Sequence, residues 1–156
     1  MADIRTLAVR LGADGLRQVR GGHPWVFDRS IRKVPPDGVA GDLAVIFDDR
    51  RRFVAIGLYD PESPIRIRVL HLGRPTTIDA DFFRSRIGAA DARRSQPDVI
   101  PSDTNGYRVV NGENDGLGAI VVDRYDDVAV LKVYSPAWWP HLAAVLAGIT
   151  ELDWCE

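Results

Sequence analysis

Apolar and polar residues alternate in short runs along the first half of the chain, and this period of two predicts β-strands. The predicted strands cover residues 4–11, 43–47, 53–58 and 65–72. Turns that contain glycine and proline separate them, as at Pro35–Gly38. Residues 16–20 are expected to form one short helical turn, because Ala13–Gly15 breaks the first strand and Gly21 follows. Residues 1–73 are therefore predicted to form a small barrel-like sheet.

Two helices are predicted in the second half of the chain. The first begins at an aspartate that can cap it, ends near Ser95, and has an apolar stripe made of Phe83, Ile87 and Ala90. The second begins near Ser135-Pro136, since proline is well tolerated at the first helical position. The expected apolar face of this second helix consists of Trp138, Leu142, Val145, Leu146 and Ile149.

A β run that ends at Val109-Val110 is predicted between these helices, and two further strands are predicted after the loop that follows it. Ile120–Tyr125 and Val128–Val133 can pair as a hairpin across the turn at Asp126-Asp127. Residues 74–156 are therefore expected to form a small domain of strands and two helices. The chain as a whole is predicted to belong to the mixed α/β (α+β) class, with one domain over residues 1–73 and a second over residues 74–156.

Charge is distributed unevenly between the two halves. Residues 1–74 contain 13 Arg and Lys against 9 Asp and Glu, a net +4, whereas residues 75–156 contain 7 against 13, a net −6. Eighteen of the 20 basic residues are arginine, the side chain best suited to bidentate phosphate contacts. A genome rich in G and C would favour arginine codons as well. The first half is thus a candidate for binding an anionic partner.

Several classes of protein are excluded by composition. No run of about 18 apolar residues is present, and charges occur throughout the first 20 residues, so neither a membrane span nor a secretory signal is expected. A single cysteine, Cys155, forbids an intrachain disulfide and fits a reducing cytoplasm. The protein is therefore expected to be cytoplasmic and to have no membrane partner.

The predicted strand over residues 65–72 carries two candidate binding residues. Arg66 and Arg68 are expected on the face opposite Ile65, Ile67 and Val69, with their guanidinium groups side by side in solvent. Like charges so close to each other repel, and a phosphate partner would relieve that repulsion. A plain solvated face is the alternative interpretation.

A glycine pair flanked by arginines is the second candidate. Glycines let a ligand approach the backbone closely and expose its N–H groups. The arginines around Gly21-Gly22 are Arg17, Arg20, Arg29 and Arg32. Such a loop can hold an RNA backbone, although two glycines also simply end a helix. Trp25 is expected in the core or at the seam of the barrel rather than against a base, because apolar residues follow it directly.

The loop over residues 111–116 fails as a metal site. Asn111, Glu113 and Asp115 match the first ligand positions of a calcium loop, but Val122 stands where the bidentate glutamate is needed. No metal ligand and no catalytic residue are therefore expected, and Cys155 is expected to be inert. Turn formation and docking against a neighbouring domain are the expected roles of this loop.

Three motifs resemble bacterial large-subunit rRNA methyltransferases of the cytosine-C5 type. Gly21–Phe27 resembles the Gly-His-Pro-Trp-Val-Phe signature of their PUA domain, and Ser63–Arg68 resembles the Ser-x-Ile-x-x-Arg segment near that domain's end. Gly112–Leu117, followed by an apolar run and Val122–Tyr125, resembles their central domain. Members usually have Pro-Gly after the leucine, where this chain has Gly118-Ala119.

The resemblance implies a PUA-like β-barrel that binds rRNA over residues 1–73 and a central α+β domain over residues 74–156. Family enzymes use S-adenosylmethionine held by a Rossmann-like domain, which is expected to be absent here, so the chain alone is predicted to bind no cofactor and to be inactive. Members are often homodimers. The RNA-binding residues implied by the motifs are Arg17, Arg20, Gly21, Gly22, His23, Arg29, Arg66 and Arg68.

The most direct interpretation is the N-terminal RNA-binding portion of an rRNA methyltransferase whose catalytic domain is missing from this chain. A free-standing RNA-binding adaptor and a truncated fragment without function are the alternatives. A protein-interaction module that uses the acidic half is a further alternative.

Overall fold

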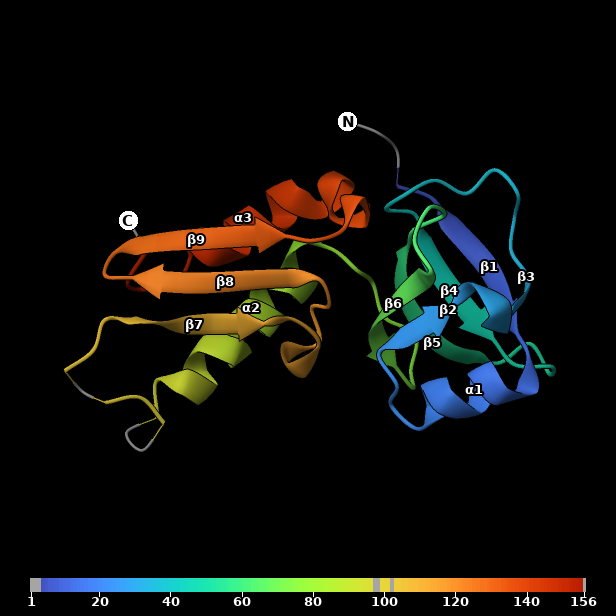
Figure 1. Ribbon diagram of the computed structural model, residues 1–156, viewed down its shortest axis with the longest axis horizontal. Coiled ribbons are helices and arrows are strands. Elements are labelled where there is room, and N and C mark those ends of the chain that lie inside the picture. Colours follow the sequence, from blue (N-terminus) through green and yellow to red (C-terminus); the bar gives the residue numbers. More distant parts are fainter. Residues whose placement is uncertain (1–3, 97–98, 102, 156) are drawn as a thin grey trace. The chain divides into compact units, whose positions relative to one another are not determined.

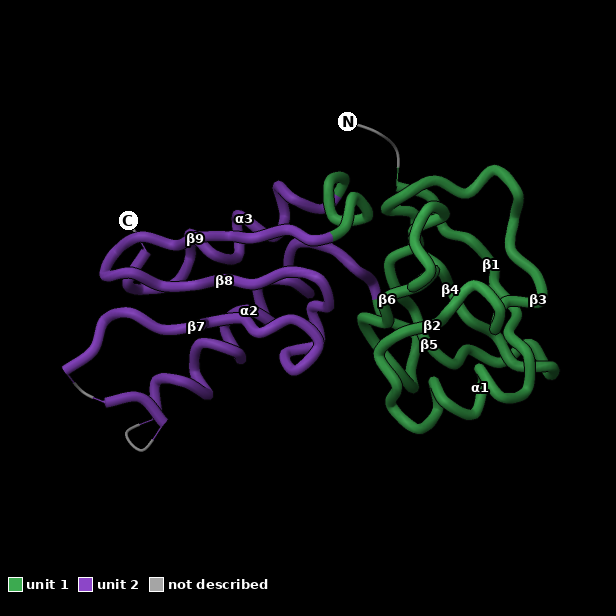
Figure 2. The backbone as a smooth tube through the Cα atoms, in the orientation of Figure 1, with its two compact units in different colours: residues 1–76, 135–140 green, residues 77–134, 141–156 purple. Residues whose placement is uncertain are grey.

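The computed structural model describes residues 4–96, 99–101 and 103–155 of the 156-residue chain (Figure 1). The chain divides into two compact units. The first unit comprises residues 1–76 and 135–140, and the second unit comprises residues 77–134 and 141–156 (Figure 2). The predicted α+β class is confirmed, and the described part of the chain contains no Rossmann-like domain.

A six-stranded curled sheet forms most of the first unit (Figure 1). Its strands are β1 (Thr6–Leu11), β2 (Trp25–Phe27), β3 (Ile31–Lys33), β4 (Leu43–Phe47), β5 (Phe53–Tyr59) and β6 (Ile65–Leu72). They lie in the order β2-β6-β5-β4-β1-β3. Only the β1–β4 pair of this described sheet is parallel, and β2 and β3 are its two edge strands.

Alternation along β1 and β4 places the core of the first unit as predicted. Leu7, Val9 and Leu11 are buried on one side of β1, and Ile46 and Ala55 pack into the same cluster from β4 and β5. The strands β4 and β5 form an antiparallel hairpin. The opposite face of β1 consequently carries its polar side chains toward solvent.

The first strand ends before Ala13 as expected, but the helical turn predicted over residues 16–20 is too short, because helix α1 covers Ala13–Arg20. Gly12 precedes the helix in an extended conformation. Gly15 lies inside the helix, where an added Cβ would come within 2.8 Å of the Ser30 Cβ. This glycine is thus explained by close packing against a neighbouring segment, not by a turn. A short 3-10 helix, η1 (Asp28–Ser30), joins β2 to β3.

The second unit combines a three-stranded antiparallel sheet with two helices. The strands β7 (Gly106–Asn111), β8 (Ile120–Tyr125) and β9 (Val128–Val133) lie in the order β7-β8-β9. The predicted hairpin is confirmed, with Ile120 opposite Val133 and Tyr125 opposite Val128. The remaining elements of this unit are α2 (Ala80–Arg94), the 3-10 helix η2 (Gly112–Asp115) and α3 (Leu142–Thr150). The 3-10 helix η3 (Pro136–His141) lies, except for its last residue, in the segment 135–140 of the first unit.

Helix α2 forms as the sequence predicts. Asp79 caps it by accepting a hydrogen bond from the Phe82 N–H at 2.9 Å. The predicted stripe of Phe83, Ile87 and Ala90 is fully buried. None of the helices in the described ranges is long and apolar enough to cross a membrane.

Two residues of the apolar face predicted for the last helix are placed wrongly. Trp138 belongs to the 3-10 helix η3, because α3 begins at Leu142 and not near Ser135-Pro136. Val145 and Ile149 are buried, but Leu146 is 44% exposed. At Gly148, an added Cβ would come within 3.1 Å of the Arg84 Cα on α2. The contact face of α3 is therefore centred on Val145 and Gly148, and Leu146 lies about 100° around the helix from Val145.

Candidate nucleic-acid interface

The turn after α1 exposes two glycines as predicted. Gly21 and Gly22 are both exposed, and Gly22 has φ +88, a left-handed conformation that favours glycine. The Gly21 N–H donates to the Arg17 carbonyl and the Gly22 N–H to the Val19 carbonyl, each at 3.0 Å. These donors close the C-terminus of α1. The turn therefore offers an open backbone surface rather than free N–H groups.

Three aromatic rings follow this turn, one just before the edge strand β2 and two on it. The Trp25 ring centroid lies 6.1 Å from that of His23 and 6.3 Å from that of Phe27, both in edge-to-face arrangements. Val26, between them, points into the core. Trp25 is half-buried and Phe27 is 38% exposed, so Trp25 lies at the rim of the core. An aromatic row at an exposed edge can stack against nucleic-acid bases.

Four of the predicted arginines lie around this turn and strand or along α1. Arg17 pairs with Asp14 at 2.9 Å, but these side chains are 77% and 80% exposed, so water screens the pair strongly. Arg66 Nη2 lies 3.9 Å from Asp28 Oδ2. Arg29 is exposed and forms no ion pair within the described part of the chain. We define the glycine-loop surface as residues 21–27 with Arg17, Arg29 and Arg66.

The predicted placement of Arg68 beside Arg66 in solvent is wrong. The Arg68 side chain is only 8% exposed, and its Nη1 lies 3.4 Å from Asp60 Oδ2. It also donates to the Ile65 carbonyl at 3.2 Å. Arg68 keeps its regular pairing with Leu58 on β5, and its guanidinium group is buried because Asp60, Ser63 and the Ile65 carbonyl surround it. Arg68 is therefore a structural residue.

Asp48 organises the turn between β4 and β5. Its Oδ1 accepts hydrogen bonds from the Arg50 and Arg52 N–H groups, each at 2.9 Å. Its Oδ2 pairs with Arg20 at 3.0 Å and with Arg52 at 2.8 Å. The hydrogen bond from the Arg52 N–H is the largest influence that holds the pKa of Asp48 at about 2. Arg20, predicted to bind RNA, therefore neutralises a buried carboxylate.

The turn that Asp48 holds forces a residue into the left-handed region. Arg51 has φ +60, although it is not a glycine. Its N–H donates to the Asp48 carbonyl at 2.9 Å, which fixes the turn. Left-handed geometry costs an L-residue about 1–2 kcal/mol. Strained backbone positions are common at binding sites, so the surface around the Arg51 side chain is a candidate site.

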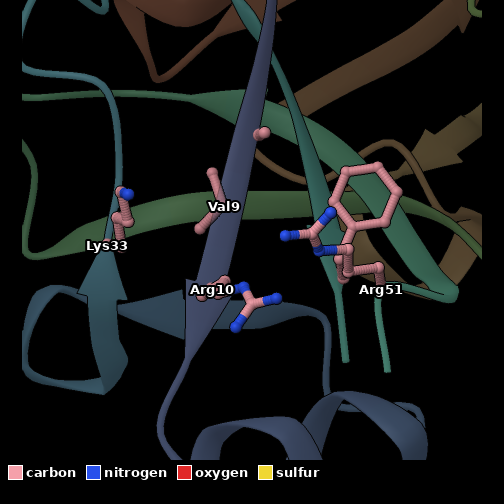
Figure 3. A pocket seen from close by; sticks show the side chains of 6 residues that line it. Val9, Arg10, Lys33 and Arg51 are labelled. Atoms are coloured by element: carbon pink, nitrogen blue, oxygen red, sulfur yellow. The ribbon is translucent and has the colours of Figure 1, made fainter. Parts of the chain in front are cut away.

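A cavity of about 590 Å³ lies beside Arg51 in the first unit (Figure 3). This basic cavity is lined by Ala8, Val9, Arg10, Lys33, Phe47 and Arg51. Arg10 lies opposite Lys33 on β3 and opposite Phe47 on β4, so these three side chains form one row across the sheet. Within the described residues, none of the three cations that line the cavity forms an ion pair.

Sequence reasoning missed Arg10, Lys33 and Arg51. Arg10 alternates with the buried residues of β1, so its outward direction was available from the pattern. The pairing of β1 with β3 was not, because β3 has only three residues and no strong alternation. The long-range register therefore brings together cations that are far apart in the sequence.

The loop that resembles the family's central domain has a structural role in the second unit. Asp115 is buried and accepts hydrogen bonds from Arg94 Nη2 at 2.8 Å, Arg93 Nη2 at 2.6 Å and the Asn111 N–H at 2.6 Å. Burial raises the pKa of Asp115, but these hydrogen bonds outweigh burial and hold the pKa below its usual value. The carboxylate therefore fastens the loop to α2.

Comparison with known families agrees with the fold. The PUA-like domain family matches residues 9–72, and the chain therefore contains a PUA-like domain. A Streptococcus mutans protein described as a SAM-dependent methyltransferase has the same fold over 92% of this chain and 37% of its own, with a TM-score of 0.77 and 13% identity. A methyltransferase complexed with SAH matches with a TM-score of 0.76 and 13% identity, over 95% of this chain and 37% of its own.

Two proteins of similar sequence show to which family this chain is related. A ribosomal RNA large subunit methyltransferase from Deinococcus radiodurans is 49% identical over 143 residues, which cover 90% of this chain and 35% of that protein. Ribosomal RNA large subunit methyltransferase I from Alteromonas mediterranea is 33% identical over 87% of this chain and 34% of its own. The chain spans about a third of the length of these relatives. The predicted resemblance is confirmed: the chain is related to the ribosomal RNA large subunit methyltransferases and matches a portion of them that includes its PUA-like domain.

Proposed function

We propose that the first unit binds large-subunit rRNA, as the N-terminal RNA-holding portion of an S-adenosylmethionine-dependent methyltransferase. One observation carries this proposal: a PUA-like domain over residues 9–72 lies in a chain that is 49% identical to a ribosomal RNA large subunit methyltransferase. The excess of positive charge in residues 1–74 supports it, because phosphate neutralisation dominates RNA affinity.

The glycine-loop surface is the proposed RNA contact. Its open turn at Gly21-Gly22 admits a sugar-phosphate backbone without steric conflict, since nothing lies within 4 Å of a Cβ built at Gly22. Arg17 and Arg29 are exposed and can exchange weak or absent carboxylate partners for phosphate. His23 and its aromatic neighbours on β2 supply rings for bases.

The described residues do not fit S-adenosylmethionine. A cofactor turn of the Rossmann type needs a glycine-rich loop between a strand and a helix. The glycine-rich loop around Gly112 and Gly116 lies instead between β7 and β8, and the Asp115 network fills it. The proposed role of this chain is therefore to hold and orient rRNA, and methyl transfer would belong to another part of the full protein.

Three further proposals follow from the family resemblance. A cytoplasmic location and a homodimer stay predictions, and sedimentation of the purified chain would test the second. A free-standing RNA-binding adaptor is the alternative function. It differs in that the chain would bind rRNA in cells without a methyltransferase domain attached to it.

RNA binding is tested with the full chain and fragments of large-subunit rRNA at low and at physiological salt. The variant Arg17→Glu/Arg29→Glu removes two exposed cations of the glycine-loop surface, and Arg74→Glu is the control outside it. Arg20 is left unchanged because it neutralises Asp48. We expect the double variant to weaken binding and to lower the salt slope by about one for each phosphate that it no longer neutralises. Absence of binding by the folded chain at low salt would contradict the proposal.

A further inference from the structure

The basic cavity, which is open to solvent, presents three cations to one space. Arg10, Lys33 and Arg51 come from β1, β3 and the β4–β5 turn, and Figure 3 shows Arg10 with Lys33 on one side and Arg51 on the other. No carboxylate residue is among those that line the cavity. From this geometry we infer a second RNA subsite, in which one phosphate lies among these cations and its neighbouring base lies against Phe47.

A second cavity of the same unit differs from the basic cavity, because a carboxylate is among its lining residues. That cavity, of about 440 Å³, is lined by Arg20, Arg52 and Asp48 among others. Both of its arginines pair with the Asp48 carboxylate. Its charges are thus already satisfied within the protein. In the basic cavity the positive charges lack such a partner among the described residues, and a bound anion would remove their mutual repulsion.

The backbone at Arg51 points to the same conclusion. The turn keeps a left-handed arginine at a position where glycine would be free of strain. The hydrogen bonds and ion pairs to the Asp48 carboxylate hold that turn in place. The strained residue is therefore preorganised, and its side chain lines the cavity. Strain of this kind is found where a side chain must be presented in a fixed position.

The remaining lining selects a nucleotide rather than a free inorganic anion. Phe47 lies in register with Arg10 on the adjacent strand, so an aromatic ring is next to the cations. Ala8 adds exposed apolar surface to the lining. A phosphate with an attached base can use both the charged and the apolar parts of this cavity, because base–aromatic contact accepts any base. The subsite is therefore expected to bind single-stranded RNA with little sequence preference.

The inference rests on the proposed function, and its test uses the full chain with a fluorescein-labelled pentanucleotide of RNA. Arg51→Gly and Lys33→Gln each remove one cation of the cavity. Arg50→Gln and Arg32→Gln are the matched controls, because they are chain neighbours, exposed, and outside the cavity lining. We expect each cavity variant to bind about tenfold more weakly and the double variant about a hundredfold, with the controls within about twofold of wild type.

Two results would overturn the inference, and they differ in what else they imply. If the cavity variants bind the pentanucleotide as the controls do, the subsite is wrong while the proposed function stands. If the wild-type chain binds neither the pentanucleotide nor rRNA fragments, both fail. Thermal melting of every variant shows whether it folds, and Lys33→Gln keeps the test valid if Arg51→Gly does not. Competition by pyrophosphate that disappears in Lys33→Gln would identify the phosphate as the bound group.

Discussion

Arg68 Nη1 lies 3.4 Å from Asp60 Oδ2 inside the first unit, and the two side chains are 8% and 2% exposed. Asp60 Oδ2 also accepts a hydrogen bond from Ser135 Oγ at 2.8 Å. The pair therefore joins the end of β5 and strand β6 to the segment at residues 135–140, which belongs to the same unit. An arginine that the sequence places among the RNA contacts is instead part of the internal structure.

Removal of Arg68 is expected to destabilise the protein rather than to change RNA contacts directly. Arg68→Ala leaves the buried Asp60 carboxylate without its cation, which costs about 3–5 kcal/mol of unfolding free energy. Arg66→Ala, two residues earlier on β6, is the control and should cost less than about 1 kcal/mol of unfolding free energy. Urea denaturation measures both. Equal stabilities of the two variants would contradict the assignment of Arg68.

The left-handed conformation of Arg51 predicts an unusual order of stability among its variants. Arg51→Gly is expected to be about 1 kcal/mol more stable than Arg51→Ala, because only glycine adopts φ +60 without strain. At an ordinary turn position the order would be the reverse or the difference would vanish. Chemical denaturation of the pair decides, and a more stable alanine variant would refute the strain at this position.

The low pKa of Asp48 predicts that the first unit loses stability in acid. The folded Asp48 pKa of about 2 lies below the value of about 4 expected in the unfolded chain, so the contribution of this carboxylate to stability is present above about pH 4 and is lost as the pH falls toward 2. Thermal melting as a function of pH should show this loss. In Asp48→Asn the melting temperature should be lower at neutral pH and should depend less on pH in that window. An unchanged acid profile would count against this role.

A side chain added at Gly116 is expected to clash with Arg86 in the second unit. Gly116 has φ +70, and the position of an added Cβ is occupied by Arg86 Nη1. Gly116→Ala is expected to cost about 1–3 kcal/mol from the strained backbone and the overlap together. Arg86→Ala in the same chain should recover the overlap part only. A double-mutant cycle measured by denaturation gives the coupling, and strict additivity would show that the two residues do not conflict.

Much of the fold follows from local pattern in the sequence. The β8–β9 hairpin is predictable because alternating residues flank a two-residue turn, and α2 is predictable because its cap and its stripe agree. Leu146 shows the limit of this reasoning: close approach at Gly148 decides which side of α3 is buried. That approach depends on a neighbouring helix and is not visible in the periodicity.

The candidate site was less predictable than the fold. The exposed glycine turn follows from its residues, but the burial of Arg68 depends on its pairing with Asp60, which also contacts the distant Ser135. Likewise, Arg10 and Lys33 meet only because a three-residue strand pairs with β1. Each of these outcomes is fixed by long-range pairing, whereas sequence patterns report mainly on neighbours along the chain.

The central claim is that the first unit holds the RNA, and ultraviolet crosslinking of the full chain to large-subunit rRNA tests it most directly. Crosslinked peptides are identified by mass spectrometry. The account predicts that they come from the glycine-loop surface and the basic cavity, with aromatic residues such as Trp25 and Phe47 prominent. Crosslinks confined to residues 77–134 and 141–156, in a chain that binds the RNA, would contradict it.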